Sequence, residues 1–550
     1  MCGIVGFTKF NQKDSYDKAK FLESINHRGP DSKNSIDNEN VFFGHSRLSI
    51  VDLDNGTQPM RYKDLTIVFN GEIYNHKELR GILVSKGYDF ETNSDTEVLL
   101  KSFHCWGENF YKQVNGMYAF GIFCSKSKDL YLARDYFGIK PLYFFLNGED
   151  LIFSSEILGV VSVLNQIKAD FVIDLDQQKE FLDKGFCSGE IINGIKDVPR
   201  GVMCVFKDGK IEYKDNKVPS MPENKKLENI LSDEVRLQLE ADVEVGVMLS
   251  GGIDSSLITA IASETKNNLK TFSVIFDTGN KYDESKYSRL VAQKFKTNHH
   301  EFLFNEKKMI QYLPKLIEAM DTPIVDPAMV PSLFLYDEIS KVVKVVISGD
   351  GGDELFGGYT HHVVRKRKYL FNLIQKFLFF IPFTEDKRRI IKKILSNNMS
   401  VQDSMNFDIY NGLDKRLLRK TDICSMRYGV EVRVPFLSSS LYNFTKKQNE
   451  DYFFSFLKGK KPLRKLVARM IDKKLAYKNK KGFRVPLKEW ILNGRLGKII
   501  KDELFHSHAI SPDVISKKQI NNLWENKKED YERLFSLYLL NKWIRKVKKQ

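Results

Sequence analysis

The run of twenty residues from Val243 to Ala262, VEVGVMLSGGIDSSLITAIA, constrains the fold of this chain more than any other stretch. Its first seven residues are mostly apolar and β-branched, which predicts a buried strand. A bare-backbone SGG turn follows that strand. From Ser255 onward the apolar residues recur at helical spacing, so a helix should begin here, with Asp254 or Ser255 near its cap. The run therefore predicts a strand, a glycine turn and a helix in direct succession.

A strand that leads through glycines into a helix N-terminus is a device for binding phosphate. The glycines let backbone N–H groups approach the anion, and the helix end adds unpaired N–H groups and partial positive charge. Asp254 fits beside a phosphate only when a divalent cation such as Mg²⁺ bridges the two. No GK[ST] follows, so the run is not a Walker loop, and a glycine pair alone would be an ordinary turn. The residues expected to contact phosphates are Ser250, Gly251, Gly252, Asp254, Ser255 and Ser256.

Length and composition bound the class of protein. The chain has 550 residues, enough for two or three domains with substantial cores. Hydrophobic residues make up 42% and charged residues 29%, as in soluble globular proteins. No uncharged apolar run reaches the ~18 residues of a membrane span; the nearest, residues 369–383, is shorter and is interrupted by Gln375 and Lys376. Because the N-terminus also lacks a signal segment, we expect a cytoplasmic protein with no membrane partner.

The formal charge of +15 raises the question of a nucleic-acid partner. Much of the excess lies between Lys458 and Lys488, where thirteen Lys and Arg residues face the single acid Asp472. Two interpretations fit this segment: a nucleic-acid stripe, or a solvated lysine-rich face partly turned toward nucleotide phosphates. We favour the second and expect no nucleic acid, because no RNA- or DNA-binding motif accompanies the charge.

The six cysteines are scattered and include no CxxC pair, so neither a zinc site nor a disulfide framework is indicated. Five of them are expected to be small core residues. Cys2 stands apart, because removal of Met1 would make it the N-terminal residue. Its α-amine, with a pKa of about 7.7–8.0, would then serve as the base for its own thiol. A cysteine at this position alone would be a weak signal.

The motifs that follow Cys2 strengthen that interpretation. Arg47 begins a strand-like run and is suited to gripping a carboxylate. Asn70 and Gly71 follow the expected strand 65–69 and could form an oxyanion hole, while Glu72 and Asp95 could hold a substrate amine. Each has an ordinary alternative: a surface ion pair for Arg47, a hairpin turn for Asn70-Gly71 and a helix cap for Asp95. Together with Cys2 they describe a clamp for glutamine.

The N-terminal segment resembles the class II glutamine amidotransferase domain, which uses an N-terminal cysteine. The matching strings are MCGIVG, HRGPD, RLSIVD, NGEIYN, SDTEV, GMYAFGIF, ARDYFGIKPLYF and SSE, nearly continuous over residues 2–160. The resemblance implies a four-layer αββα N-terminal-nucleophile fold over residues 1–212. It implies that Cys2 is the nucleophile and that Asn70 and Gly71 form the oxyanion hole. The glutamine contacts that it implies are Arg47, Leu48, Ser49, Ile50, Val51, Asn70, Gly71, Glu72 and Asp95.

A polar stretch with two prolines, residues 213–226, is expected to link this domain to a second one at 227–550. In the second domain, strands are expected at 269–276 and 342–347, and a helix near Asp283 and Glu284. The second of these strands ends in another glycine loop, SGDGGDELFGGY. Alternating strands and helices predict a parallel α/β sheet with ligands at the strand C-terminal ends. Both glycine loops fall at such ends, so Asp254 and Asp353 are plausible Mg²⁺ ligands around one nucleotide.

The whole chain resembles the glutamine-hydrolysing asparagine synthetase family, through SGGIDSS, SGDGGDELFGGY, GVEVRVPFL and KKGFRVP. The resemblance implies an adenylating domain with a helical C-terminal part. It assigns Asp350 to formation of the acyl-adenylate and Lys460 to stabilisation of that intermediate. From the residues alone, Lys460 or Arg433 could neutralise an acyl-phosphate, or both could be solvated surface cations. The further ATP contacts that it implies are Leu249, Val274, Ser348 and Gly349.

The implied function is hydrolysis of glutamine to ammonia and amidation of aspartate, with ATP and Mg²⁺ as cofactors. Two departures leave the acceptor open: DTPIVDPAMVP lacks a threonine-rich string of the family, and residues 365–420 match little. The nearest alternative is the same chemistry on another carboxylate, such as a sugar uronic acid in surface polysaccharide synthesis. A decayed regulatory scaffold, a nucleic-acid binder and a β-lactam-forming enzyme rank lower. Small-molecule substrates are the expected partners, and a homodimer is an assembly that the sequence leaves open.

Overall fold

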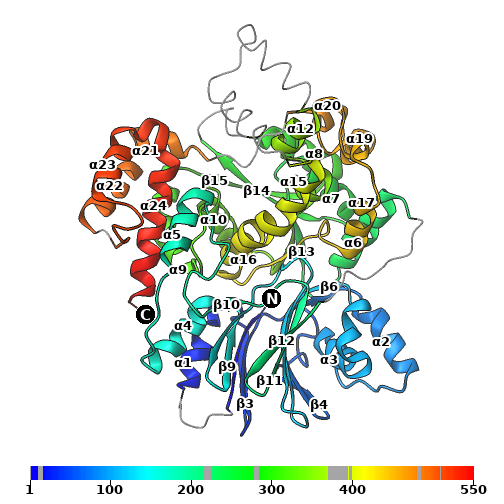
Figure 1. Ribbon diagram of the computed structural model, residues 1–550. Coiled ribbons are helices and arrows are strands. Elements are labelled where there is room, and N and C mark those ends of the chain that lie inside the picture. The colour runs from blue at the N-terminus through cyan, green and yellow to red at the C-terminus, as the bar shows by residue number, and fades with distance from the viewer. Residues whose placement is uncertain are drawn as a thin grey trace.

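The computed structural model describes residues 2–9, 16–215, 225–277, 284–368, 394, 399–479, 485–507 and 509–549. The N-terminal half forms the lower part of the molecule in Figure 1, and a parallel sheet with its helices forms the upper part. The apolar run 369–383, Asp283 and most of the KKGFRVP string lie outside the described residues. Within the described ranges, no helix combines the length and the apolar composition that a membrane span needs.

Two six-stranded antiparallel sheets form the centre of the N-terminal half. The first has the order β10-β8-β9-β1-β3-β2, with β1 Gly3–Thr8, β2 Ser32–Asp37, β3 Val41–Arg47, β8 Tyr143–Asn147, β9 Asp150–Ser154 and β10 Lys196–Asp197. The second has the order β12-β11-β7-β6-β5-β4, with β4 Met60–Tyr62, β5 Leu65–Ile73, β6 Gly116–Cys124, β7 Leu130–Arg134, β11 Val202–Lys207 and β12 Lys210–Asp215.

The two sheets face each other across an apolar core to which Ile4 and Phe43 of the first sheet and Val68 and Phe123 of the second contribute. Helices cover both outer faces, which gives four layers. On the first sheet lie α1 Lys18–Glu23 and α4 Ile157–Gln166, and on the second lie α2 His76–Ser85 and α3 Asp95–Trp106. The short helices η1 Asn26–Arg28 and η2 Gly107–Lys112 complete this half. The expected αββα fold is confirmed.

The second half is built on a five-stranded sheet in which every neighbouring pair is parallel. Its order is β15-β14-β13-β16-β17, with β13 Val245–Met248, β14 Lys270–Phe276, β15 Asn298–Phe304, β16 Val345–Ile347 and β17 Glu431–Arg433. The chain leaves β13 toward β14 on one side and later returns to its other side at β16. This reversal makes the gap beyond the C-terminal ends of β13 and β16 a topological switch point, where ligands of such sheets bind.

Helices surround this sheet and extend beyond it. Those nearest the sheet are α6 Leu227–Gln238, α7 Ile253–Thr265, α8 Ser285–Phe295, α9 Glu306–Ala319, α10 Met329–Ser340 and α11 Gly352–Phe356. Next in the chain come α12 Thr360–Lys366, α15 Val401–Phe407, the π-helix η4 Asp408–Leu418, α16 Arg419–Met426, α17 Ser439–Lys446, α18 Glu450–Phe453, α19 Lys461–Met470 and α20 Lys473–Tyr477. The helical C-terminal part comprises α21 Leu487–Asn493, α22 Arg495–His506, α23 Lys517–Glu525 and α24 Lys527–Val547.

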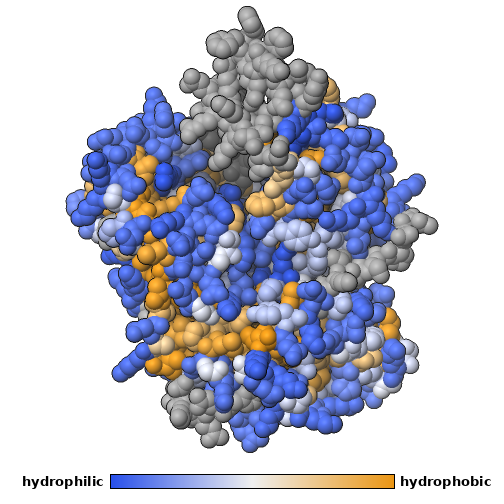
Figure 2. Space-filling view, in the orientation of Figure 1, coloured by the Kyte–Doolittle hydropathy of each residue, from blue (hydrophilic) through white to orange (hydrophobic). Residues whose placement is uncertain are grey.

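Residues 216–224 of the expected linker lie outside the described residues, and the described parts of the two halves also contact each other. Strand β12 runs to Asp215, three residues past the expected boundary at 212, and α6 begins at Leu227. Helix α5 (Leu175–Lys184) belongs to the N-terminal half in sequence, yet it packs against α24 (Figure 1). The face seen in Figure 2 is mostly hydrophilic, and its apolar residues gather on the left, around α24 and α4. The packing of α5 against α24 shows that the two halves share a packed interface.

Candidate functional site

Cys2 lies buried at the start of β1, with 8% of its surface exposed. It contacts a small, polar pocket of about 30 Å³. The pocket is lined by Cys2, Arg47, Leu48, Ile50, Val51, Gly56, Gln58, Phe69, Gly71, Glu72, Ser94, Asp95, Thr96 and Glu431. Most of the expected glutamine contacts thus lie around one space, whereas Ser49 and Asn70 do not line it. Burial raises the pKa of the Cys2 thiol, so the thiol needs a nearby base to become a nucleophile.

Asn70 lies directly against the backbone of Cys2. Its Oδ1 accepts a hydrogen bond from the Cys2 N–H at 3.0 Å. Its Nδ2 is buried and, among the described residues, has no hydrogen-bond partner. A buried amide donor without a partner costs free energy unless a ligand accepts its hydrogen bond. Asn70 therefore holds the backbone nitrogen of Cys2 with one end of its amide and leaves the other end as a buried donor.

The alternative of a hairpin turn at Asn70-Gly71 is excluded, and the strand expected at 65–69 is longer, because β5 continues through both residues to Ile73. Asn70 pairs with Ala119 and Gly71 with Tyr118 of β6. The nine-residue partner strand β6 carries the pairing past the polar NGE sequence, so long-range sheet contacts override the local turn signal. Both residues are therefore held by a rigid sheet rather than by a loop.

Three acidic side chains line the pocket: Glu72, Asp95 and Glu431. Burial raises the pKa values of Glu72 and Asp95 above their ordinary range. Asp95 accepts a hydrogen bond from the Ile73 N–H at 2.9 Å. Glu72 is paired with Arg433, whose Nη2 lies 3.1 Å from its Oε2. A pocket with several buried acids favours an ammonium group, as the α-amine of an amino acid would supply.

Arg47 stands at the end of β3, and its guanidinium contacts the backbone of the loop that follows this strand. Its Nη1 donates to the Leu53 carbonyl at 2.9 Å, and its Nη2 donates to the Asp52 carbonyl at 2.5 Å. These bonds fix the guanidinium within the pocket wall, although they use part of its donor set. Ser49 turns away, and its N–H donates to Asp31 Oδ2 at 2.7 Å.

A second, larger cavity of about 330 Å³ lies at the switch point of the parallel sheet. This volume lies in the range of small-molecule sites. The residues expected from the sequence that line it are Leu249, Ser250, Gly252, Asp254, Ser255, Val274, Ser348, Gly349, Asp350, Asp353 and Lys460. Gly251 and Ser256 were also expected but are not among its lining residues. Both glycine loops thus face one space, as their positions after β13 and β16 predict.

The helix after the first glycine loop begins earlier than expected. Gly252 is the cap of α7, so Ile253 and Asp254 already belong to its first turn. Gly251 adopts a left-handed φ of +72°, and a Cβ there would lie 2.7 Å from the Ser288 nitrogen. Only glycine fits without strain. The N-terminus of a thirteen-residue helix consequently opens directly onto the cavity, where it favours an anion.

Lys460 lies between the two carboxylates expected to bind metal. Its Nζ is 2.5 Å from Asp254 Oδ2 and 2.6 Å from Asp353 Oδ1, and only 5% of its side chain is exposed. Burial alone would lower the pKa of Lys460, but the two carboxylates more than offset it, so that pKa is raised. Lys460 is therefore a charged, buried cation at the wall of the cavity, which excludes the solvated surface cation as an interpretation.

The donor set beside Lys460 also fits Mg²⁺. Both carboxylate oxygens lie within 2.6 Å of one nitrogen, so one small cation could contact both. Hard oxygen ligands of this kind suit Mg²⁺, which keeps several waters and binds through one or two carboxylates plus phosphates. Asp254 and Asp353 are therefore the residues that would hold the ion, and Lys460 would share them with it.

Another part of the cavity wall contains Asp350, whose Oδ2 accepts a hydrogen bond from Thr421 Oγ1 at 3.3 Å. Lys420 lines the same cavity and donates to Asp326 Oδ2 at 3.1 Å. Burial alone would lower the pKa of Lys420, but Asp326 and then Asp350 raise it. Asp326 belongs to the DTPIVDPAMVP insert. This wall therefore combines the insert with helix α16 beside the expected adenylation residue.

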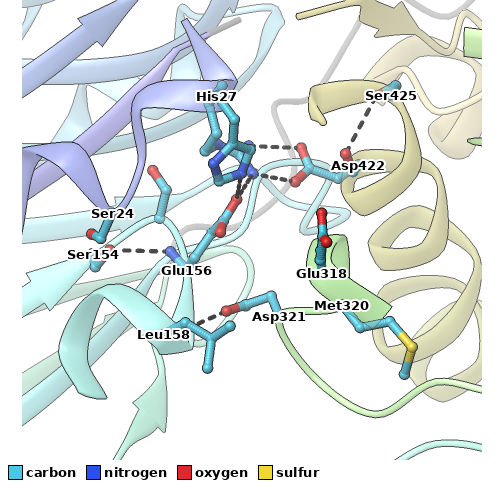
Figure 3. A network of polar contacts seen from close by, with 12 residues as sticks. Ser24, His27, Ser154, Glu156, Leu158, Glu318, Met320, Asp321, Asp422 and Ser425 are labelled. Atoms are coloured by element: carbon cyan, nitrogen blue, oxygen red, sulfur yellow. Dashed lines mark hydrogen bonds and ion pairs between the residues drawn. The ribbon is translucent and has the colours of Figure 1, made fainter. Parts of the chain in front are cut away.

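The two sites are connected by buried ion pairs between the halves. Arg28, with 1% exposed, donates through Nη1 to Glu156 at 2.9 Å and through both terminal nitrogens to Asp422 of α16 at 2.8 and 3.0 Å. Its Nε also donates to the carbonyl of Cys2 at 3.2 Å. Figure 3 shows the Glu156 side chain next to His27, and Asp422 extending from its helix toward the same cluster. The backbone of Cys2 is thus linked to the second half through one guanidinium.

Sequence reasoning missed several residues of both sites. Glu431 and Arg433 stood in the quoted GVEVRVPFL string, yet nothing local indicates that they reach the Cys2 pocket. Arg433 is fully buried, with Glu431 at 2.6 Å and Glu72 at 3.1 Å, and is not a solvated cation. Arg28 stood in HRGPD without a role. For Glu431 and Arg433 the available signal was a charged residue inside an apolar string, which suggests a buried pair but does not name its partner.

The comparisons with known proteins agree with this architecture. The family described as asparagine synthase matches residues 226–545, and the glutamine amidotransferase domain family matches residues 1–217. Asparagine synthetase (glutamine-hydrolysing) 1 of Bacillus subtilis strain 168 is 31% identical, over 90% of this chain and 88% of its own. Asparagine synthetase (glutamine-hydrolysing) 3 of the same strain is 28% identical, over 97% of this chain and 94% of its own.

Among solved structures, a glutamine phosphoribosylpyrophosphate amidotransferase from B. subtilis overlaps with a TM-score of 0.29 and 13% identity. The overlap covers 66% of this chain and 77% of that chain. This likeness is too weak to support any statement about substrates.

Proposed function

The chain belongs to the asparagine synthase family, and from this premise we propose that it is a glutamine-dependent asparagine synthetase. In this proposal it transfers the amide nitrogen of glutamine to the β-carboxylate of aspartate through a β-aspartyl-AMP intermediate. The observation that carries the proposal is the pairing of two unlike sites in one chain. A polar pocket holds Cys2, and a nucleotide-sized cavity lies where the two glycine loops meet.

In the first half-reaction, removal of Met1 would leave Cys2 with a free α-amine. That amine takes the thiol proton, directly or through water, and the sulfur attacks the glutamine amide carbon. In this scheme Nδ2 of Asn70 donates to the oxyanion; the support is that Oδ1 of the same amide holds the Cys2 nitrogen while Nδ2 is a buried donor without a partner among the described residues. Collapse of the tetrahedral intermediate releases ammonia and leaves a glutamyl thioester. Water then hydrolyses the thioester to glutamate and restores the thiol.

In the second half-reaction, a carboxylate must be activated because it is a poor electrophile. The β-carboxylate oxygen of aspartate attacks the α-phosphorus of ATP, and pyrophosphate leaves. Lys460 is a buried cation at the cavity wall, so it can stabilise the negative charge that develops there. Bound Mg²⁺, held by Asp254 and Asp353, would neutralise phosphate charge. Ammonia then attacks the acyl carbon, and AMP departs as the amide forms.

Ammonia has to travel from one pocket to the other as NH₃, because ammonium is not a nucleophile. The parallel sheet separates the two sites. Glu431 lines the Cys2 pocket and pairs with Val345, while Ser348, three residues beyond Val345, lines the ATP cavity. At a rise of about 3.3 Å per residue, the backbone between these levels spans about 10 Å. The buried interface around β17 is therefore where we expect a shielded path.

The test is AMP release by the purified full chain with Mg-ATP and glutamine, with and without aspartate, together with asparagine measured by mass spectrometry. The proposal expects AMP and asparagine in equal amounts, both dependent on aspartate. Glutamine hydrolysis without aspartate-dependent AMP would retain the first half-reaction and overturn the choice of acceptor. In that case other carboxylates, beginning with uronic acids, would be tested in the same assay.

A further inference from the structure

A cluster of three metal-binding side chains lies outside both sites described above. His361 and His362 are consecutive residues of α12, and Asp408 is the first residue of the π-helix η4. The Nε2 atoms of both histidines lie 2.7 Å from the same oxygen, Asp408 Oδ2. All three ligand atoms lie within 4.8 Å of one another. His362 is fully buried, whereas 33% of the His361 side chain is exposed.

We propose that His361, His362 and Asp408 form a binding site for one divalent transition-metal ion, with Zn²⁺ as the expected occupant. Two imidazole nitrogens and one carboxylate oxygen are a donor set typical of zinc and of other borderline metals. Mg²⁺ prefers oxygen ligands and would avoid this site. The site is therefore chemically distinct from the carboxylate pair beside Lys460.

The spacing of the cluster suits zinc after a small adjustment. Ligands about 2.0–2.1 Å from a tetrahedral zinc ion lie about 3.3 Å from one another. The two nitrogen-to-oxygen distances are 2.7 Å, so the carboxylate has to move back by about half an ångström. Asp408 and His361 are both partly exposed, which gives an ion a route from solvent and leaves room for a water as the fourth ligand.

The second contacts of the ligands set an expectation for affinity. Metal-bound histidines usually donate their other N–H to a carboxylate or carbonyl, and loss of such a partner costs about 10–100-fold in affinity. The Nδ1 of His362 is buried and has no hydrogen-bond partner among the described residues. We therefore expect binding weaker than that of a catalytic zinc site with complete second contacts.

The proposed metal site lies next to a segment that packs against Lys460. Tyr359, one residue before α12, stacks on His361 with ring centroids 5.3 Å apart, and its hydroxyl donates to Glu354 of α11. Gly358 approaches the cavity so closely that a Cβ would lie 2.2 Å from Lys460 Cε. A bound ion would therefore fix the segment that packs against Lys460.

The other ligand reaches the domain interface. The π-helix that begins at Asp408 carries Asp414, which pairs with Arg134 at 2.9 Å, and Lys415, which pairs with Asp197 at 2.6 Å. Metal binding would thus join the wall of the ATP cavity to contacts between the two halves. This inference stands independently of the proposed acceptor.

Direct metal binding by the full chain tests the proposal. The purified protein is freed of metal with a chelator and titrated with Co²⁺, whose visible ligand-field absorption reports nitrogen ligation, and then with Zn²⁺. Metal content is measured by mass spectrometry. We expect one equivalent of Co²⁺, displaced by Zn²⁺ and retained in a large excess of Mg²⁺. Absence of Co²⁺ binding, or its displacement by Mg²⁺, would overturn the site.

Two variants and one matched control locate the ion. His361→Gln changes a partly exposed ligand and should fold normally, while Asp408→Asn keeps the shape of the carboxylate. Each should weaken Co²⁺ binding at least about tenfold, since even the loss of a second contact has an effect of that size. His506→Gln, at an exposed histidine on α22, should bind like the wild type. Unchanged affinity in His361→Gln would place the ion elsewhere and refute the proposal.

Discussion

The Cys2 pocket and the ATP cavity differ in size and in the kind of structure that surrounds them. The first is about 30 Å³ and is lined by polar side chains from strands and a helix, among them Arg47 of β3, Glu72 of β5 and Asp95 of α3. The second is about 330 Å³, lies at the end of a parallel sheet and presents glycine loops and a helix N-terminus. A small amino acid can be held by fixed side chains, whereas a polyphosphate needs many backbone donors.

The two sites also differ in the arrangement of their charged side chains. Around Cys2, buried acids exceed the nearby guanidinium partners, and burial raises the pKa values of Glu72 and Asp95. In the ATP cavity, two acids instead share the ammonium of Lys460. The first site is thus prepared for an incoming cation. The second carries its own cation and is prepared for incoming anions.

The largest expected effect is the loss of one activity while the other remains. Cys2→Ala removes the nucleophile, so glutamine-dependent asparagine formation should fall by at least about a thousandfold, as in other enzymes that lose a covalent nucleophile. Ammonia-dependent formation should remain, because the ATP cavity is untouched. Both rates are measured by asparagine yield with either nitrogen donor. An equal loss of both would remove the role assigned to Cys2.

The reciprocal variant sharpens the comparison. Lys460→Met removes the buried cation and leaves Asp254 and Asp353 without it, so AMP formation should fall by about 10²–10³-fold. Glutamine hydrolysis, measured as glutamate release, should change little. Lys465→Met, at an exposed lysine on the same helix α19, is the control and should retain both activities. A similar fall in AMP formation in that control would show that helix charge rather than the Lys460 contact matters.

A smaller effect tests the division of labour within Asn70. Asn70→Asp keeps an acceptor for the Cys2 nitrogen but replaces the Nδ2 donor with a second acceptor. The kcat for glutamine hydrolysis should fall by about a hundredfold, with KM little changed, because the lost contact forms only in the transition state. Steady-state glutamate release gives both constants. A raised KM with an unchanged kcat would instead make Asn70 a binding residue.

The last prediction concerns stability rather than turnover, at Asp321, which lies between the two halves (Figure 3). Burial, and then the Glu156 carboxylate, raises the pKa of Asp321 to about 7, above its unfolded value of about 3.9. The stability from this shift is complete below about pH 4 and is lost as pH rises through about 7. Asparagine does not ionise and keeps an acceptor for the Leu158 N–H.

Asp321→Asn should therefore match the wild type in stability near pH 4 and exceed it at pH 8, by at most about 4 kcal/mol. Urea unfolding midpoints at the two pH values measure the difference. Asp176→Asn, at an exposed carboxylate on α5, is the control and should be no more stable than the wild type at pH 8. A wild type that is as stable as Asp321→Asn at pH 8 would contradict the raised pKa.

Local patterns were enough to predict much of this molecule. The SGG turn could be placed because glycines that precede apolar residues at helical spacing indicate a turn followed by a helix. The convergence of both glycine loops followed from parallel topology alone. Asn70 could not be placed correctly, because only pairing with the distant strand β6 extends β5 through it. The ion-pair partners of Lys460 and Arg433 could not be predicted either, because the sequence does not show which distant residue lies beside a buried charge.

The three-residue strand β17 sets a limit on how this protein can be divided or recombined. Glu431 from that strand forms part of the wall around Cys2, and Arg433 holds Glu72 in place. The amidotransferase half is thus not a self-sufficient module, since part of the wall around Cys2 comes from Glu431, 429 positions later in the chain. Engineers who graft this half onto a different ligase, and evolution when it exchanges domains, would have to carry β17 along or rebuild its two charges.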